Sequence, residues 1–169
     1  MLSDLIREGM IIPELEYRKK EDVIREICRL FVEAGVVSDL EKFIESIQKR
    51  EQIESTAIGD GIAIPHGRSE TVKGLAVAFA GSKEGIDFES LDGKPVHLIF
   101  MIAAPNEVRK EYLQAVARIA RLLKIKDLKR KLLEAKTRED VMAVIKEFDS
   151  RFPTRMEVET KEGRVVYKS

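Results

Sequence analysis

The chain has 169 residues, of which 44% are hydrophobic, a composition typical of one soluble domain with its own core. Its 30 basic and 30 acidic residues cancel to a formal net charge of zero. This balance argues against nucleic acid or an anionic membrane surface as a partner, because such partners favour an excess of lysine and arginine.

The sequence contains no apolar run near the ~20 residues that a membrane span needs, and residues 1–9 do not have the pattern of a signal peptide. We therefore expect a cytoplasmic protein without direct membrane insertion. The lone Cys28 excludes an intramolecular disulfide, and its apolar neighbours predict a core thiol. With only two histidines, no ligand cluster for structural zinc is present, and we expect no metal.

Charged residues make up 36% of the chain, while side-chain amides are scarce. They are Asn106, Gln48, Gln52 and Gln114. This bias is typical of proteins from hot-living organisms, so we expect a thermophilic source.

Two amphipathic helices are predicted in the first third of the chain. Residues 20–34 carry apolar side chains at helical spacing, and Gly35 follows as a helix stop. Residues 38–41 read Ser-Asp-Leu-Glu, which has the form of a capping box that opens the second helix. Arg50 lies near the end of this helix and leads into the next segment.

A histidine follows a short apolar stretch in the middle of the chain. Residues 62–64 predict a short strand, and Pro65 fixes φ and ends its hydrogen-bond ladder. We interpret His66 as a presented side chain, with Gly67 leaving room for a large partner. For three glycines, space for a docking protein and ordinary turn punctuation are equally good interpretations: Gly59, Gly61 and Gly67.

Residues 75–80 and 96–103 are nearly continuous apolar runs, typical of strands that are buried on both faces, and residues 87–95 between them have turn chemistry. From Asn106 the pattern is helical, with one apolar stripe: Tyr112, Leu113, Val116, Ile119, Ala120 and Leu123. Shorter helices are expected from Asp127 and from Thr137. Interspersed strands and helices predict an α/β protein whose sheet is covered on both faces.

The chain changes character after Phe148. Residues 156–160 alternate between apolar or hydroxyl side chains and charges, residues 161–163 predict a turn, and residues 165–167 predict a second strand. We therefore expect a main domain at 1–148 and a C-terminal extension at 149–169 that forms a small β-hairpin.

The segment around the histidine carries a family resemblance. Arg50, Glu51 and residues 55–66 closely resemble the phosphorylated-histidine segment of sugar phosphotransferase system (PTS) enzyme IIA domains of the fructose/mannitol class, and the match continues in order from about residue 11 to residue 148. The resemblance implies a three-layer α/β/α sandwich with a central mixed sheet flanked by helices. It implies His66 as the phosphorylated residue and Arg50 as the active-site arginine, with no cofactor.

The residue types fit this chemistry. A neutral imidazole titrates near physiological pH and can attack a phosphoryl group and later release it. On spacing alone, Arg50 would be read as a solvated helix-end cation stabilised by the helix dipole. The family resemblance favours a functional role, in which its planar, permanently charged fork binds phosphoryl oxygens. Ser55 and Thr56 could donate hydroxyl groups, but loop hydroxyls more often cap their own backbone.

The sequence departs from the family at one position. The resemblance implies a second active-site histidine early in the helix after the second long strand, and Tyr112 stands there instead. A phenol can donate a hydrogen bond but stays neutral near pH 7; Tyr112 could also be simply a core-edge residue. His97 alternates with apolar neighbours in a predicted strand, so we interpret it as structural.

Two functions follow from the resemblance. The first is a phosphocarrier, in which His66 takes phosphate from the carrier protein HPr and passes it to a cysteine on a IIB domain. The second is a regulatory module of the nitrogen-type branch, in which phosphorylation changes docking to a target protein. The missing histidine and the C-terminal extension favour the second. A hydrolase built on His66 and Arg50 is poorly supported, because no residue is marked as a water-activating base.

Overall fold

The computed structural model describes residues 1–153, 156–159 and 165–168. The helical elements are η1 (Leu2–Asp4), η2 (Glu8–Met10), α1 (Lys20–Glu33), α2 (Leu40–Ile53), α3 (Lys110–Lys124), α4 (Lys126–Glu134) and α5 (Arg138–Arg151). The strands are β1 (Ile11–Ile12), β2 (Ala57–Gly59), β3 (Ile62–Ala63), β4 (His66–Arg68), β5 (Ala76–Ile86), β6 (Val96–Ala104), β7 (Met156–Glu159) and β8 (Val165–Lys168).

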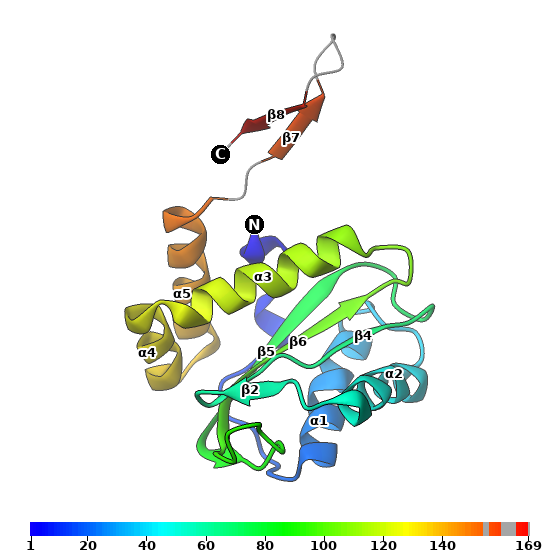
Figure 1. The fold of residues 1–169 in the computed structure, drawn as a ribbon, viewed down its shortest axis with the longest axis vertical. Helices are drawn as coiled ribbons and strands as arrows, with labels where there is room; N and C mark the ends of the chain where they lie inside the picture. The colour runs from blue at the N-terminus through cyan, green and yellow to red at the C-terminus, as the bar shows by residue number, and fades with distance from the viewer. Residues whose placement is uncertain (154–155, 160–164, 169) are drawn as a thin grey trace.

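Three layers make up the body of the molecule (Figure 1). Helices α3, α4 and α5 cover one face of the central sheet, and α1 and α2 cover the other. The strand order is β1-β5-β6-β3-β2, with β4 also paired to β6. Pairs β1–β5, β3–β6 and β4–β6 are parallel, whereas β5–β6 and β2–β3 are antiparallel. The predicted α/β/α sandwich with a mixed sheet is therefore confirmed.

The two long strands separate two hydrophobic cores. Phe100 and Ile102 of β6 enter the core beneath α3, α4 and α5, while Met101 and Ala103 enter the core against α1 and α2. This alternation follows from the two-residue period of a strand. Both faces are buried, as the continuous apolar runs predicted.

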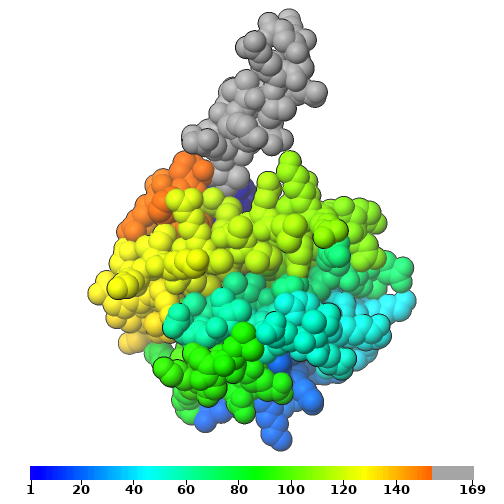
Figure 2. Space-filling model, in the orientation of Figure 1, coloured from blue at the N-terminus to red at the C-terminus, as the bar shows by residue number. Residues whose placement is uncertain are grey.

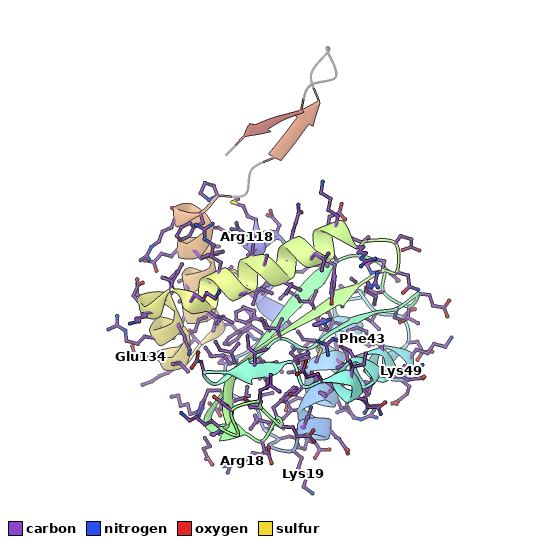
Figure 3. The ribbon with its side chains drawn as sticks, in the orientation of Figure 1. Arg18, Lys19, Phe43, Lys49, Arg118 and Glu134 are labelled. Carbon is purple, nitrogen blue, oxygen red and sulfur yellow. The ribbon has the colours of Figure 1, made fainter. Side chains whose placement is uncertain are left out.

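Helix α2 shows the resulting polarity. Figure 3 places Phe43 inside the fold and Lys49 of the same helix at its edge. Phe43 is fully buried and packs edge-on against Phe31 of α1, with ring centroids 5.4 Å apart. Burial of such a side chain stabilises the fold by roughly 2 to 3 kcal/mol relative to leaving it exposed, so this contact anchors the helix that carries Arg50.

The ends of α1 and α2 are set by local hydrogen bonds. At Gly35, φ is +75°, and the N–H groups of Gly35 and Val36 donate to the carbonyls of Val32 and Phe31. This is a Schellman stop, as Gly35 predicted. The predicted capping box from residue 38 is wrong by one residue: Asp39 caps α2 by accepting from the N–H of Lys42 at 3.1 Å.

The histidine segment runs along one edge of β6. Residues 62–63 pair with Leu98 and Ile99, and residues 66–68 pair with residues 102–104. The expectation that Pro65 ends the ladder is therefore wrong. Proline cannot donate, but its carbonyl accepts from Ile102 N at 3.0 Å, so the pairing resumes at His66.

Strand β5 is longer than the predicted range of 75–80 and continues to Ile86. The strand bends through a shift in register between Gly81 and Ile86. On α3 the buried stripe is rotated from the predicted one. Leu113 is 54% exposed, whereas Ala115 and Leu122 are buried, because neighbouring positions on a helix are only 100° apart.

The C-terminal part begins as expected and then continues further. Thr137 forms a capping box with Asp140 at the start of α5. The helix runs to Arg151, past the boundary placed after residue 148. Strands β7 and β8 pair antiparallel, and the predicted turn at residues 161–163 lies outside the described residues. Within the described part of the chain, no helix has both the length and the apolar character to span a bilayer.

Candidate active site

His66 begins β4, where the edge of the sheet meets the start of α3 and the end of α2. In the space-filling view the cyan and turquoise surface of α2 and of strands β2 and β3 lies directly below α3 (Figure 2). The ring is half-buried, and its Nδ1 lies 2.9 Å from the carbonyl oxygen of Ile64. A carbonyl oxygen only accepts, so Nδ1 carries the ring proton. Nε2 therefore holds the lone pair.

Arg50 contacts this second nitrogen. It lies in the last turn of α2, and its Nε donates to His66 Nε2 at 3.1 Å. Its Nη1 donates to the carbonyl oxygen of Glu54 at 2.8 Å, which fixes the guanidinium plane beside the ring. The two residues that carried the resemblance are thus brought together, and a positive charge lies against the unprotonated nitrogen.

The surroundings lower the pKa of His66 below its usual value. Burial is the largest cause, and the charge of Arg50 adds to it, while the hydrogen bond to Ile64 and the charge of Glu51 act in the opposite direction. Burial and the charge of Arg50 both disfavour the imidazolium ion. The ring is therefore neutral at physiological pH, which is the form that has a lone pair for nucleophilic attack.

Tyr112 approaches the ring from the first turn of α3. The His66 and Tyr112 ring centroids lie 5.3 Å apart at an interplanar angle of 62°, an edge-on contact. Tyr112 is 9% exposed, and burial raises the pKa of its phenol, so the group remains protonated. The residue that replaces the expected second histidine thus lies at the site, where it can donate a hydrogen bond but carries no charge.

The two hydroxyl candidates hydrogen-bond to groups other than His66. Ser55 Oγ donates to the carbonyl oxygen of Phe88 at 2.9 Å and accepts from Ala57 N. Thr56 is buried, and both its hydroxyl and its N–H donate to the carboxylate of Glu51. The structure thus does not bring these hydroxyls to His66. Their role as hydrogen-bond donors to the phosphoryl group stays a prediction.

Glu51 is a residue whose position the sequence did not reveal. Its side chain is 6% exposed and forms an ion pair with Lys20 Nζ at 3.0 Å, in addition to its bonds with Thr56. The carboxylate thereby ties the loop before β2 to the end of α2, one residue after Arg50. Its place directly after Arg50 was the available signal, but Lys20 lies 31 positions earlier and could not be paired with it by spacing.

The glycines near His66 have structural roles. Gly67 is buried, and a Cβ at this position would collide with Ser46 Oγ and lie 3.1 Å from Ile47 Cδ1. The expectation that Gly67 leaves room for a partner is therefore wrong; it lets β4 lie close to α2. Gly61, at φ +75°, turns the chain between β2 and β3, and a Cβ there would lie 3.3 Å from the ring of His97.

His97 lies away from this site. Its Nδ1 is 2.8 Å from the carbonyl oxygen of Ser82, and its ring packs against the turn at Gly61 and against Gly85. The ring joins β6 to the bent part of β5. Its interpretation as a structural histidine therefore agrees with its contacts.

The fold and this histidine site place the chain in a known class of phosphotransfer domains. Over residues 4–148 the chain matches the family described as "Phosphoenolpyruvate-dependent sugar phosphotransferase system, EIIA 2". The match covers most of the chain, and the protein belongs to this family.

Relatives in this family have two kinds of names. The fructose-specific EIIA component of Haloferax volcanii is 39% identical over 76% of this chain and 83% of its own length. A nitrogen regulatory protein of Bradyrhizobium diazoefficiens is 34% identical over 85% of this chain and 94% of its own length. The fructose-specific EIIABC component of Bacillus subtilis is 38% identical over 88% of this chain, but the chain spans only 23% of that protein.

Solved structures that superpose on this chain also include both a nitrogen regulatory protein and a sugar-specific IIA domain. The nitrogen regulatory protein IIA-Ntr from Neisseria meningitidis superposes with a TM-score of 0.79 at 29% identity, over 85% of this chain and 97% of that one. Mannitol IIA from Escherichia coli superposes with a TM-score of 0.71 at 24% identity, which establishes the shared fold. The fold therefore does not separate the sugar branch from the nitrogen branch.

Proposed function

We propose that the protein is a phosphohistidine carrier of the sugar phosphotransferase system, in which His66 Nε2 accepts a phosphoryl group from HPr and passes it to the cysteine of a IIB domain. The observation that carries this proposal is that the two ring nitrogens have different hydrogen-bond partners. Nδ1 is held by the carbonyl of Ile64, and Nε2 faces the guanidinium of Arg50. Such a ring has one tautomer, one orientation and one nucleophilic atom.

The transfer can be written as two displacements at phosphorus. In the first, the Nε2 lone pair attacks the phosphoryl group on the donor histidine, the new P–N bond forms, and the donor's P–N bond breaks with its electron pair returning to the donor nitrogen. His66 keeps its proton on Nδ1, which donates to the carbonyl oxygen of Ile64. In the second, a thiolate attacks the same phosphorus, and the electron pair of the breaking P–N bond returns to Nε2.

Arg50 has two consecutive tasks in this scheme. Before the reaction its Nε–H holds the Nε2 lone pair, so the guanidinium must release this atom as the attack begins. Its N–H donors then face the phosphoryl oxygens, where a planar cation is well suited to bind two of them. The start of α3 near Tyr112 adds the positive end of a helix dipole. Charge stabilisation of this kind is commonly the largest single contribution to such a transfer.

The rim of the site supports a protein as the phosphoryl donor and acceptor. Ile53, at the end of the helix that carries Arg50, is 81% exposed, and Leu113, next to Tyr112, is 54% exposed. Exposed apolar side chains beside a charged centre are typical of a docking surface. They give a small polar sugar nothing to bind, so we assign sugar selection to another component of the system.

The proposal extends to location and source. A carrier that exchanges phosphate with HPr works in the cytoplasm, and we place the protein there. The charge-rich, amide-poor composition supports a thermophilic source. We expect a melting temperature above the ordinary mesophile range of roughly 45 to 65 °C, measured by calorimetry. A transition within that range would remove this part of the proposal.

The test is phosphoenolpyruvate-driven labelling with enzyme I and HPr. We expect an acid-labile, base-stable phosphate on the wild-type protein and on His97→Ala, and none on His66→Ala. His97→Ala is the matched control because it removes the other imidazole of the chain. Labelling that persists in folded His66→Ala would overturn the proposal. No labelling of any folded variant with a matched HPr would favour a binding role that does not depend on phosphate.

A second candidate function is nitrogen-type regulation, and Tyr112 is the observation that favours it. The phenol lies against His66 in place of the imidazole that the family resemblance implies. A neutral phenol cannot add positive charge at the phosphoryl group, so transfer onward could be slow and the phosphorylated state long-lived. A persistent phosphorylated state suits a protein that signals by changing its docking to a target.

Transfer onward distinguishes the two functions. The labelled protein is mixed with an isolated IIB domain, and the loss of label from His66 is followed in the wild type and in Tyr112→His. Transfer to the IIB cysteine within seconds supports the transport role. Label retained by the wild type but released by Tyr112→His supports regulation, whereas equal lifetimes in both proteins would remove Tyr112 as an argument.

A further inference from the structure

Arg68 shares a strand face with His66. Side chains of a strand alternate, so residues 66 and 68 of β4 point to one side and residue 67 to the other. The packing agrees, because Gly67 lies against Ser46 and Ile47 of α2. Same-face neighbours are about 6.6 Å apart along a strand, which is within the reach of an arginine side chain. Arg68 can therefore reach a group bound to the His66 ring.

Tyr112 connects the two side chains. Its ring centroid lies 5.3 Å from that of His66 and 5.9 Å from Arg68 Cζ, so one phenol ring contacts both residues. Both Arg50 and Arg68 act to lower the pKa of Tyr112, although burial outweighs them and raises it. Arg68 thus lies against the phenol ring that also contacts His66, and Arg50 contacts His66 itself.

The charge of Arg68 is not neutralised. The side chain is exposed, and within residues 1–153 its contact is the ring of Tyr112 rather than a carboxylate. A phosphoryl group carries nearly two negative charges at neutral pH, since its second pKa is about 6. Arg50 supplies one positive charge to Nε2, and a second cation is needed to balance the group.

We propose that Arg68 is a second phosphoryl-binding cation of this site, bonding the oxygens of the group on His66 Nε2 while the ring of Tyr112 positions its guanidinium. This inference rests on His66 as the phosphorylated residue. It names Arg68 as a residue that touches the transferred group and Tyr112 as a positioning residue, in which the ring matters more than the hydroxyl.

The first test uses a direct probe of charge around the phosphoryl group. Phosphoramidate, which phosphorylates imidazoles without a donor protein, loads the folded protein, and the ³¹P signal absent from His66→Ala is followed against pH. A neighbouring cation favours the dianion. We therefore expect the titration midpoint of the phosphoryl group to rise by at least about half a pH unit in Arg68→Gln, with partial restoration in Arg68→Lys.

The matched control is Arg29→Gln, which removes an exposed arginine from α1 and lowers the net charge equally. It should leave the midpoint unchanged. Tyr112→Phe should behave like the wild type, and Tyr112→Leu should reproduce part of the Arg68→Gln shift. A midpoint in Arg68→Gln that matches the wild type or Arg29→Gln would overturn the inference. Since HPr is absent, this result is separate from failure of the proposed HPr-dependent transfer.

A kinetic test separates phosphoryl binding from partner docking. At saturating HPr, Arg68→Gln should lower the rate of His66 phosphorylation about tenfold, less than the loss of a buried preorganised donor because Arg68 is exposed to solvent. A raised half-saturating HPr concentration with an unchanged maximal rate would instead assign Arg68 to docking, and would overturn the inference.

Discussion

Two half-buried arginines of this protein have opposite charge environments. Arg118 belongs to a cluster that we call the terminal clamp, in which Asp149 accepts from Arg118 Nη2 at 2.9 Å and from the N–H groups of Leu2 and Ser3 at 3.0 and 2.8 Å. Figure 3 places Arg118 between α3 and the end of α5. Arg50, by contrast, faces the neutral ring of His66.

The difference lies in what satisfies each charge. Burial works to raise the pKa of Asp149, but hydrogen bonds from Ser3, Leu2 and Arg118 outweigh it, and the pKa is lowered. The clamp is thus a charge-balanced pair. At His66 the Arg50 guanidinium contacts the ring's lone pair and the carbonyl of Glu54, and among residues 1–153 no carboxylate contacts it. An arginine whose charge is balanced by a carboxylate holds the fold together, whereas one without a carboxylate partner can bind an anion.

The largest expected effect is on transfer in Arg50→Ala. Loss of the guanidinium should lower the rate of His66 phosphorylation by about 10²- to 10³-fold, the usual cost of removing a preorganised donor to a developing negative charge. Arg50→Lys should recover only part, since a point charge cannot replace the fork. The measurement is stopped-flow transfer from HPr, with the melting temperature as the folding control. A rate within twofold of the wild type would contradict this assignment.

Asp149→Ala should lower stability and leave transfer unchanged, the reverse of the result expected for Arg50→Ala. Removing one partner of a buried pair leaves Arg118 and two N–H groups without their acceptor, so we expect the free energy of unfolding to fall by about 3 kcal/mol, with transfer at His66 unchanged. Chemical denaturation measures the loss. Asp127→Ala is the control, because its ion pair with Arg151 is exposed and should matter far less. Equal losses in both variants would remove the distinction between clamp and surface pair.

Gly67→Ala should affect both stability and transfer by a smaller amount. The added methyl would push against Ser46 Oγ and Ile47 Cδ1, an overpacking that costs about 1 to 3 kcal/mol and moves α2, with Arg50, away from β4. Gly74→Ala is the control, since its Cβ would meet nothing within 4 Å. Ser46→Ala in the Gly67→Ala background should restore part of the loss. If Gly67→Ala lost neither stability nor transfer activity, α2 would be able to move away from β4 without cost.

The smallest expected effect is that of pH on the stability of the fold and on the rate of transfer. The folded-state pKa of His66 is lowered, so its neutral form persists below the ordinary value near 6.5. The unfolded chain binds the proton first as pH falls. The stability that this ring contributes is therefore complete above about 6.5 and is lost as pH falls from there through the lower folded pKa.

Transfer should follow the same titration, with a flat rate from pH 7 upward and a fall only below the lowered pKa. An NMR titration, with the His66 signal assigned by its absence in His66→Ala, gives the folded value directly. A midpoint at or above the ordinary histidine value would show that burial and Arg50 do not control this ring.

Much of the fold could be predicted because its signals are local. Apolar runs in β5 and β6 predicted strands buried on both faces, and Gly35 and Thr137 predicted helix ends from their own backbone preferences. Errors arose where tertiary contacts decided the outcome. Strand β5 continues past its apolar run because Ile86 still pairs with Val96 of β6, and β4 follows Pro65 because the Pro65 carbonyl still accepts from Ile102.

The site divides in the same way. The sequence alone determined which residues are candidates for this chemistry, since the family resemblance points to His66 and Arg50 by type and order. It did not determine where Gly67 faces, what neutralises Glu51, or that Arg68 and Tyr112 contact each other. Those contacts join residues that are 20 to 44 positions apart along the chain. Only the packed sheet and helices decided them, because contact energies depend on distance in space and not on distance along the chain.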